Sequence, residues 1–236
     1  MTGATAAART PYMTKRALDF VLASLLLLVT LPIMVVVAVG SAIALRTWPF
    51  FVQRRTGLDG RSFRFLKIRT LPKSTPTYLL KDELHPDELP AFCRGLRRMH
   101  LDELPQLLLV LIGKMSLVGP RPEMVEFHDR LDPDFAAART SVLPGCTGLW
   151  QVGAGCTGLI GDSPEYDRYY LRHQSLRLDL WILGRTVRMM LTGGPLVHLS
   201  DIPEWAAREP KAPVPAPVPA PVLAPARRDF ELAEVD

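Results

Sequence analysis

No charged residue lies between Phe20 and Leu45, a stretch too long and too apolar to be the ordinary helix of a soluble domain. As a helix rising about 1.5 Å per residue it would reach roughly 39 Å, more than a hydrocarbon core of about 30 Å. A signal peptide fits poorly, because its apolar region is typically only about 7–15 residues long. The stretch therefore predicts a helix in contact with a membrane.

Pro32 lies near the middle of this stretch and leaves two topologies open. A proline removes one helical hydrogen bond, here to the carbonyl of Leu28, for which the Thr30 hydroxyl is a candidate partner. If the helix broke there, each half would reach only about 18–20 Å, too short to span alone. Proline is also tolerated in spanning helices, so composition favours neither a re-entrant nor a spanning segment.

Basic residues flank the apolar stretch on both sides, as expected if both ends lie on the cytoplasmic side. They are Arg9, Lys15 and Arg16 before it, and Arg46, Arg54, Arg55 and Arg61 after it.

The remaining composition narrows the class of protein. A net charge of +4 is too small to indicate nucleic-acid binding but suits a protein that rests on an anionic lipid surface. The three cysteines form no CxxC pair, which indicates reduced thiols in the cytosol. Proline–alanine repetition after Pro203 favours polyproline II, so we expect residues 201–236 to form a disordered tail.

Between the apolar stretch and the tail, the pattern predicts an α+β domain that is mainly α. Residues 50–55 and 62–69 flank an Asp-Gly turn signal and predict a β-hairpin, with Lys67 and Arg69 on one face of its second strand. Residues 71–90 carry four prolines and predict an irregular loop. Further helices are expected at 89–99, from Asp102 onward, at 123–139, 164–172 and 176–191. The last of these fits either a core-facing helix or a membrane-surface helix.

The adjacent carboxylates Asp102 and Glu103 are the most chemically informative pair. Asp102 stands where an N-cap would, and helix capping is the ordinary explanation for such a pair. Their neighbourhood is basic, however, with Arg97 and Arg98 before them and a proline-framed Arg121 after the next helix. Arginine forks match phosphate oxygens, and two carboxylates in such a site attract a divalent cation such as Mg²⁺. The pattern indicates a site for a pyrophosphate with bound metal.

Two other patterns carry less weight. The segment from Gly153 to Gly158 matches G-x-G-x-x-G, but the dinucleotide fingerprint requires a preceding strand and a helix opening at the last glycine. Here Asp162, Ser163 and Pro164 follow almost at once, so we do not expect dinucleotide binding. The five histidines show no metal-binding spacing and receive no role as ligands.

Taken together, the motifs resemble those of the bacterial sugar transferases, in the small form that transfers a sugar phosphate to polyprenyl phosphate. The resemblance runs from about Lys15 to Thr192. The matching motifs are Lys15-Arg16-Ala17-Leu18-Asp19, the apolar run with Pro32, Gln53 to Gly60, Leu66 to Thr70, Leu101-Asp102-Glu103-Leu104-Pro105-Gln106, Met115 to Glu123, Leu143 to Gln151, and Tyr166 to Tyr170.

The resemblance implies roles for individual residues. Asp102 would be the nucleophile, and Glu103 would hold Mg²⁺ with it. Arg97 and Arg121 would contact phosphate groups, with Pro120 and Pro122 shaping the loop around Arg121. Lys67 and Arg69 are further candidates for phosphate binding, and Pro32 would break a re-entrant membrane helix. The chain departs from the family pattern at Leu109, often Asn; at Lys114, often Asp; and at Gly153-Ala154-Gly155, where the family usually carries an arginine.

The resulting expectation is an enzyme, a phosphotransferase that moves a sugar-1-phosphate from a nucleoside diphosphate sugar to polyprenyl phosphate and so initiates a lipid-linked glycan. A catalytically degenerate membrane adaptor is the competing hypothesis, and a different glycan-assembly step on the same lipid carrier is a second enzymatic alternative. The expected organisation is a cytoplasmic segment at 1–14, a re-entrant helix at 15–46, a catalytic domain with amphipathic interface helices at 47–200, and the tail. The catalytic domain and both termini would face the cytoplasm from the inner membrane, and no nucleic acid would be bound.

Overall fold

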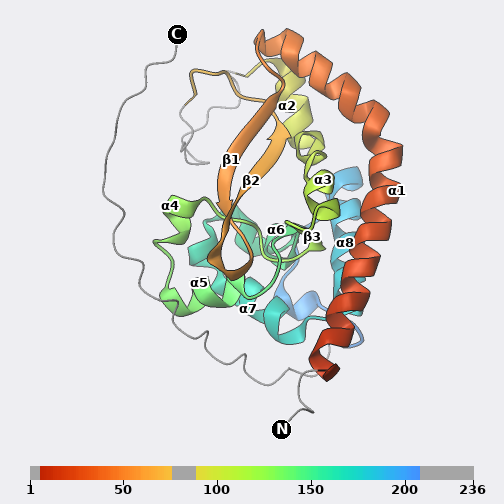
Figure 1. The fold of residues 1–236 in the computed structure, drawn as a ribbon, viewed down its shortest axis with the longest axis vertical. Coiled ribbons are helices and arrows are strands. Elements are labelled where there is room, and N and C mark those ends of the chain that lie inside the picture. Colours follow the sequence, from red (N-terminus) through yellow and green to blue (C-terminus); the bar gives the residue numbers. More distant parts are fainter. Residues whose placement is uncertain (1–5, 76–88, 208–236) are drawn as a thin grey trace.

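The computed structural model describes residues 6–75 and 89–207 (Figure 1). Its described part is mainly helical, with two small two-stranded sheets, which confirms the predicted α+β class. In chain order the elements are α1 (Ala6–Leu45), β1 (Phe50–Thr56), β2 (Ser62–Ile68), α2 (Ala91–Arg98), α3 (Gln106–Leu111), β3 (Ser116–Val118), α4 (Val125–His128), α5 (Pro133–Thr140), β4 (Gly145–Thr147), α6 (Leu149–Val152), α7 (Pro164–His173) and α8 (Leu176–Thr192). Short 3-10 turns include η3 (Leu101–Glu103), η4 (Ala154–Thr157) and η6 (Leu199–Asp201).

Helix α1 differs from the prediction of a helix broken at Pro32. It continues through Pro32 as one helix and follows an arc along one side of the molecule (Figure 1). The Thr30 hydroxyl does not reach the carbonyl of Leu28 but donates to that of Leu26, at 2.7 Å. Bonds of this i−4 kind often bend a helix without interrupting it. Proline and threonine together therefore account for a bend where the sequence suggested a break.

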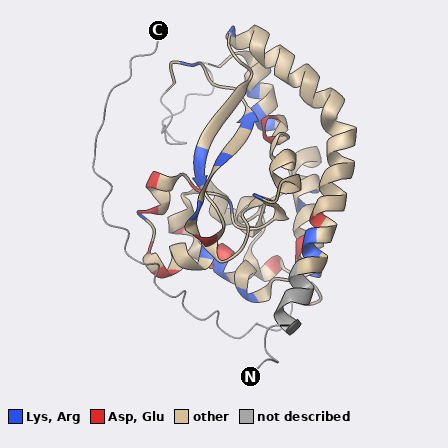
Figure 2. Ribbon diagram, in the orientation of Figure 1, with Lys and Arg blue, Asp and Glu red and all other residues tan. Residues whose placement is uncertain are grey.

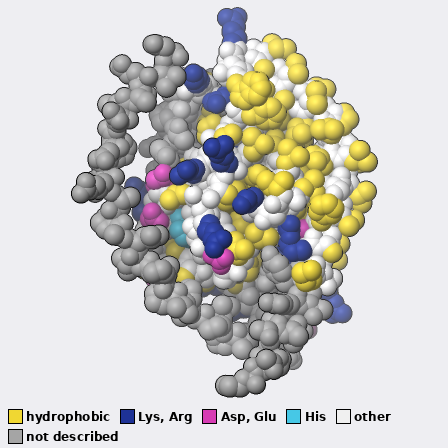
Figure 3. Space-filling model, viewed as in Figure 1, with side chains coloured by type: hydrophobic (Ala, Val, Ile, Leu, Met, Phe, Trp, Pro, Cys, Tyr) yellow, Lys and Arg dark blue, Asp and Glu magenta, His cyan; other side chains and the backbone are white. Residues whose placement is uncertain are grey.

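The outer face of α1 is strongly apolar. The segment Met13–Leu45 is long and apolar enough to cross a membrane, and its most apolar window has a mean hydropathy of 2.9 and is only 17% buried. Figure 3 shows hydrophobic side chains covering this side of the molecule, while Figure 2 places charges on α1 only near its N-terminal end. A helix that exposes this much apolar surface indicates membrane association.

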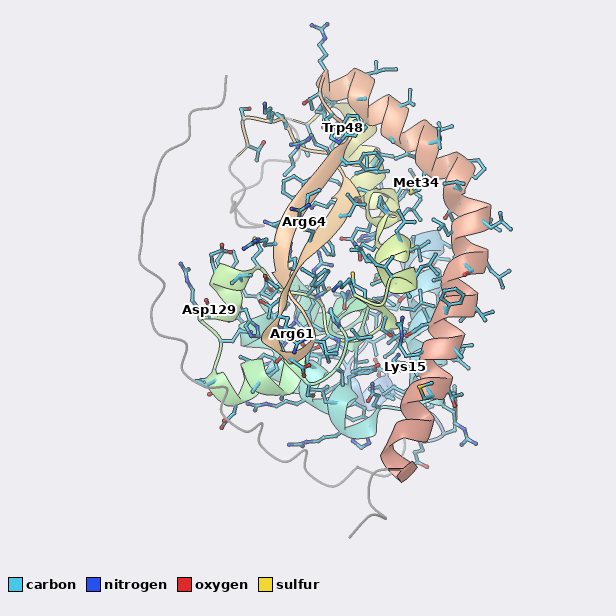
Figure 4. The ribbon with its side chains drawn as sticks, viewed as in Figure 1. Lys15, Met34, Trp48, Arg61, Arg64 and Asp129 are labelled. Atoms are coloured by element: carbon cyan, nitrogen blue, oxygen red, sulfur yellow. The ribbon has the colours of Figure 1, made fainter. Side chains whose placement is uncertain are left out.

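The N-terminal part of α1 is fixed to the domain by Lys15, Arg16 and Asp19. Lys15 points inward from α1 (Figure 4) and donates to Asp179 of α8 at 2.7 Å and to the carbonyl of Val118 at 3.0 Å. Arg16 donates to the carbonyls of Met115 and Val110, at 3.0 and 3.1 Å. Asp19 accepts hydrogen bonds from the Ser116 hydroxyl and the Leu117 amide, at 2.7 and 3.1 Å. These charges therefore serve protein contacts rather than only the lipid surface suggested by their place beside the apolar stretch.

The C-terminal half of α1 packs closely on α2 and on the end of β2. A Cβ at Gly40 would lie 2.4 Å from the ring of Phe92, so any side chain there would force that ring to move. The Ser41 hydroxyl donates to the carbonyl of Arg69. An apolar groove of about 500 Å³ opens along the same half of α1. Its lining is Met34, Val35, Ala38, Val39, Ala42, Ile43, Pro49 and Phe50.

The hairpin formed by β1 and β2 confirms the prediction from the Asp-Gly signal. The strands pair antiparallel from Phe50 opposite Ile68 to Thr56 opposite Ser62. Asp59 and Gly60 both take positive φ, 55° and 71°, as a tight reversal requires. Phe63 and Phe65 are buried on the inner face, and Lys67 follows them on the same face.

The C-terminal elements complete the core and correct the predicted start of the tail. Leu178 and Ile182 of α8 are fully buried, which confirms the core-facing interpretation for one face of this helix. Leu180, Val187 and Leu191 are exposed, and contact of that face with the membrane surface stays a prediction. After α8, Ile202 and Ala206 are also buried. The prediction of disorder from residue 201 is therefore wrong for residues 201–207, while 208–236 lie outside the described residues, as does most of the predicted loop at 71–90.

Candidate active site

The predicted helix beginning at Asp102 is shorter than expected, and Asp102 does not cap it. His100 takes a left-handed conformation, φ 54°, which ends the α2 segment and turns the chain into η3. Asp102 lies within this turn, and α3 begins only at Gln106. Turn η3 packs against β2 and α2, which leaves Asp102 only 5% exposed. A buried carboxylate without a capping role requires another explanation, and chemistry is the first to consider.

Glu103 is held by the arginine that follows β3. The Arg121 guanidinium donates from Nη2 to Glu103 Oε1 at 3.3 Å, with the two side chains 29% and 22% exposed. Burial opposes ionisation of Glu103, but Arg121, Lys67 and His100 outweigh it, so the pKa of this carboxyl lies below its usual range. Glu103 is therefore the more acidic member of the pair.

Asp102 is shifted in the opposite direction. Burial and the adjacent charge of Glu103 raise its pKa, although Lys67 and Arg97 oppose the shift. The environment thus separates two neighbouring carboxyls into one that ionises readily and one that is more basic. Such a division is typical of paired carboxylates with distinct chemical roles.

The predicted basic residues fall into two groups. Lys67 and Arg97 act electrostatically on Asp102, and Arg97 also donates to the Thr70 hydroxyl at 3.3 Å. Burial lowers the pKa of Lys67 to about 8. Arg69 instead donates to the carbonyl of Trp48 at 3.2 Å. The structure therefore brings Lys67, Arg97 and Arg121 around the carboxylate pair and directs Arg69 toward the end of the hairpin.

Three features of the site were missed by the sequence analysis. Arg55 and Arg139 are buried cations that contact the loop carrying Arg121, and the Gln106 side chain lies beside Glu103 and helps to lower its pKa. The sequence analysis named Arg55, but only as one of the basic residues that follow the membrane segment. No pattern near Arg139 distinguished it from an exposed helical arginine.

The carboxylates suit Mg²⁺ shared with a substrate rather than a metal held by protein alone. Among the described residues, no group of three or more His, Cys, Asp or Glu side chains could hold a metal ion. Mg²⁺ is commonly bound by one or two carboxylates together with substrate phosphates and water. Asp102 and Glu103 can supply that number of ligands, and the arginines beside them can bind the phosphates.

The glycines of the G-x-G-x-x-G match have a packing explanation. The segment forms η4, and a Cβ at Gly153 or Gly155 would lie 2.4 or 2.9 Å from the ring of Tyr166. Position 155, which lacks the arginine common in the resembled family, therefore has no room for any side chain unless both Ser163, whose Cβ would lie 2.8 Å away, and Tyr166 move. The glycines let η4 pack against α7.

The site thus belongs to a membrane-associated domain with a buried pair of carboxylates in a basic, phosphate-compatible setting. Comparison with known proteins agrees: the chain matches the family model described as bacterial sugar transferase over residues 10–193, and it belongs to that family.

Three relatives illustrate the range of the family. The chain is 34% identical over 185 residues to a UDP-N-acetylgalactosamine-undecaprenyl-phosphate N-acetylgalactosaminephosphotransferase of Aeromonas hydrophila, covering 76% of this chain and 44% of the relative. It is 36% identical over 187 residues to a UDP-glucose:undecaprenyl-phosphate glucose-1-phosphate transferase of Caulobacter vibrioides, covering 75% and 70%. It is 30% identical over 194 residues to the exopolysaccharide production protein ExoY of Rhizobium meliloti, covering 74% and 84%. The chain thus spans less than half of the Aeromonas protein and most of the other two.

Proposed function

We propose that this protein transfers a sugar-1-phosphate from a nucleoside diphosphate sugar to a polyprenyl phosphate such as undecaprenyl phosphate, and so initiates a lipid-linked glycan. The observation that carries the proposal is the buried Asp102, whose raised pKa contrasts with that of Glu103 beside it. The names of the relatives supply the two substrate classes, a UDP-sugar and undecaprenyl phosphate.

Asp102 is the nucleophile of the proposed reaction. Its carboxylate attacks the phosphorus that bears the sugar, and the bond from that phosphorus to the bridging oxygen breaks. The nucleoside monophosphate leaves with the electron pair, and the sugar phosphate remains on Asp102 as an acyl phosphate. An oxygen of polyprenyl phosphate then attacks the same phosphorus, and the acyl-phosphate bond breaks to restore the carboxylate.

The other residues of the site prepare this chemistry. Arg121 and Arg97 neutralise phosphate oxygens, which otherwise repel an anionic nucleophile. Glu103 and Asp102 would hold Mg²⁺, which supplies additional neutralisation of phosphate charge when bound. Lys67, on the neighbouring strand, favours the ionised form of Asp102. Pro120 and Pro122 restrict the loop that presents Arg121.

The architecture supports a soluble donor and a lipid acceptor. The hydrophobic surface of α1 fits the bilayer, and the apolar groove along α1 is suited to an isoprenoid or acyl chain. The core cluster that contains Met34, Val37 and Ala38 of α1 also contains Ile68, the residue after Lys67. Membrane contact and the cationic residues are therefore joined through one packed layer. In the proposed topology α1 is re-entrant, and the catalytic domain and both termini face the cytoplasm.

The test uses purified protein in nanodiscs with Mg²⁺, undecaprenyl phosphate and a panel of UDP-sugars. A covalent intermediate predicts that labelled UMP exchanges into the UDP-sugar without undecaprenyl phosphate. Asp102→Asn should abolish both exchange and transfer, and Glu103→Gln should raise the Mg²⁺ concentration needed for transfer. Asp129→Asn, which changes an exposed carboxylate (labelled in Figure 4), is the matched control and should retain activity.

Two results would contradict the proposal. Exchange that requires undecaprenyl phosphate, or persists in Asp102→Asn, rules out Asp102 as the nucleophile. Failure of the folded, unmutated protein to transfer any sugar phosphate favours the adaptor hypothesis instead.

A further inference from the structure

The loop Gly119–Glu123, which presents Arg121, is held in an unusual way. Its two prolines have no amide hydrogen, so the loop cannot be fixed as an ordinary strand through its own donors. Four consecutive carbonyls accept hydrogen bonds from outside the loop instead. The bonds run from Gly145 N to Pro120 O at 2.9 Å, from Arg139 Nη2 to Arg121 O at 2.6 Å, from Arg55 Nη1 to Pro122 O at 2.9 Å, and from Thr56 N to Glu123 O at 2.9 Å.

Arg139 provides the first charged contact. Its Nε donates to Asp167 of α7 at 2.7 Å, and both side chains are almost fully buried, with 3% and 2% exposed. The same guanidinium extends Nη2 to the carbonyl of Arg121 itself. A planar arginine can serve both acceptors at once, whereas a lysine ammonium has no fixed fork. Asp167 and Arg139 thus connect helix α7 to the main chain of Arg121.

Arg55 of β1 provides the second charged contact. It is 9% exposed and donates from Nη1 to the carbonyl of Pro122, from Nε to Gln53 Oε1 at 3.0 Å, and lies 3.6 Å from Glu123. Burial and the nearby charge of Arg121 lower the pKa of Arg55 to about 10. The positive charges of Arg55 and Arg121 therefore repel each other. A side chain needed here only for packing would not have to be charged.

We propose that Arg55 and Arg139 are positioning residues that clamp the main chain at the carbonyls of Arg121 and Pro122 and so hold the Arg121 guanidinium at Glu103 and the donor phosphate. The inference rests on the proposed transfer reaction for its catalytic consequence, but the clamp itself is a property of the fold. Because a displacement of about 1 Å in a catalytic group can cost about 100-fold in rate, a loosened loop should be costly.

The first test is a double-mutant cycle. Arg139→Lys and Arg55→Lys keep the positive charge but lose the planar guanidinium that donates to two acceptors at once. Each should lower kcat/KM for the UDP-sugar by roughly 10- to 100-fold per folded molecule. In an Arg121→Ala background the same substitutions should have almost no further effect, because the group they position is absent. Arg168→Lys is the control. This arginine follows Asp167 in the sequence, but it is half-exposed and its ion-pair partner is the exposed Asp132, at 3.7 Å, so the same substitution there should leave kcat/KM unchanged.

The second test needs no substrate. The amides of Thr56 and Gly145 donate to loop carbonyls, so their hydrogen exchange reports on the loop. Both should exchange faster in Arg139→Lys and Arg55→Lys, while the Arg69 amide, bonded to the carbonyl of Pro49 at the other end of the hairpin, keeps its wild-type rate.

The outcomes separate the clamp from the proposed function. Losses that persist at full size in the Arg121→Ala background overturn the clamp, as does unchanged exchange at Thr56 and Gly145. A lower melting temperature with unchanged kcat/KM also overturns it, because that result describes a merely structural pair. If the unmutated protein transfers no sugar phosphate, the proposed function fails alone, and the exchange measurement decides the clamp.

Discussion

Replacing Lys15 with methionine should destabilise the fold by several kcal/mol, because it leaves the carboxylate of Asp179 buried without its cation. The two side chains are 13% and 5% exposed, and Lys15 also donates to the carbonyl of Val118. Removing one partner of a buried ion pair typically costs about 3–5 kcal/mol. Asp179 would retain one hydrogen bond, from the Tyr170 hydroxyl at 2.8 Å.

Protonation sets an upper limit on this penalty. Burial already raises the pKa of Asp179 above its ordinary 3.8, with Lys15 opposing the shift. Without Lys15 the pKa of Asp179 rises further. The largest possible penalty at pH 7 is the free energy of protonating a carboxyl whose ordinary pKa is 3.8, which is about 3 pKa units or about 4 kcal/mol. Since the folded state then binds the proton more readily than the unfolded state, the destabilisation is full at neutral pH. It shrinks as pH falls through the folded-state pKa of Asp179 toward 3.8.

The assay is urea unfolding in detergent micelles at several pH values, followed by helical circular dichroism. Adding Asp179→Asn to Lys15→Met should recover most of the loss, because the amide carries no charge and can still accept from Tyr170. Arg168→Gln, which removes an exposed ion pair, should cost less than about 1 kcal/mol. A loss below about 1 kcal/mol for Lys15→Met, or one that does not shrink at lower pH, would refute this account.

Other predictions follow from the site and the anchor. Because the Lys67 cation is lost as pH rises through about 8, transfer should decline there, and Lys67→Arg should extend activity to higher pH; an unchanged alkaline limb rejects the role. A chain ending at Ala207 should keep its specific activity in nanodiscs, and a large loss at unchanged folding would show that the tail is needed. Pro32→Ala should straighten the helix and shift some molecules to a spanning topology. Single cysteines before Ala6 and at Arg61, in a cysteine-free background, read this out by labelling from each side. Opposite-side labelling in the unmutated anchor contradicts the re-entrant topology.

Local patterns predicted the local structure well. The apolar run of α1, the Asp-Gly turn of the hairpin and the apolar spacing of α8 each contain their signal within a few turns of chain. The errors arose where one residue altered the path of the backbone. His100 adopts a positive φ and moves the start of α3 past Asp102, and Pro32 bends a helix that packing keeps continuous.

Long-range contacts escaped the sequence analysis for a different reason. Arg139 and Asp167 are 28 residues apart, and neither carries a local mark that distinguishes a buried pair from two exposed charges. Lys15 was interpreted as a basic flank of a membrane segment, although its partner is 164 residues away. The carboxylates and most of the surrounding basic residues were found because they lie in compact motifs, whereas the residues that hold those motifs together are dispersed.

The contacts of Lys15, Arg16 and Asp19 also bear on the biogenesis of the protein. Apart from the ion pair between Arg16 and Asp19 at 3.5 Å, their partners lie 94–164 residues further along the chain, so these contacts with the domain cannot form when the apolar helix first leaves the ribosome. At about 5–20 residues per second, the wait for Asp179 lasts roughly 8–33 s. Helix α1 must therefore reach the bilayer before Lys15, Arg16 and Asp19 can make their contacts with the domain. The final depth of α1 in the membrane is set only when α8 has been synthesised and packed.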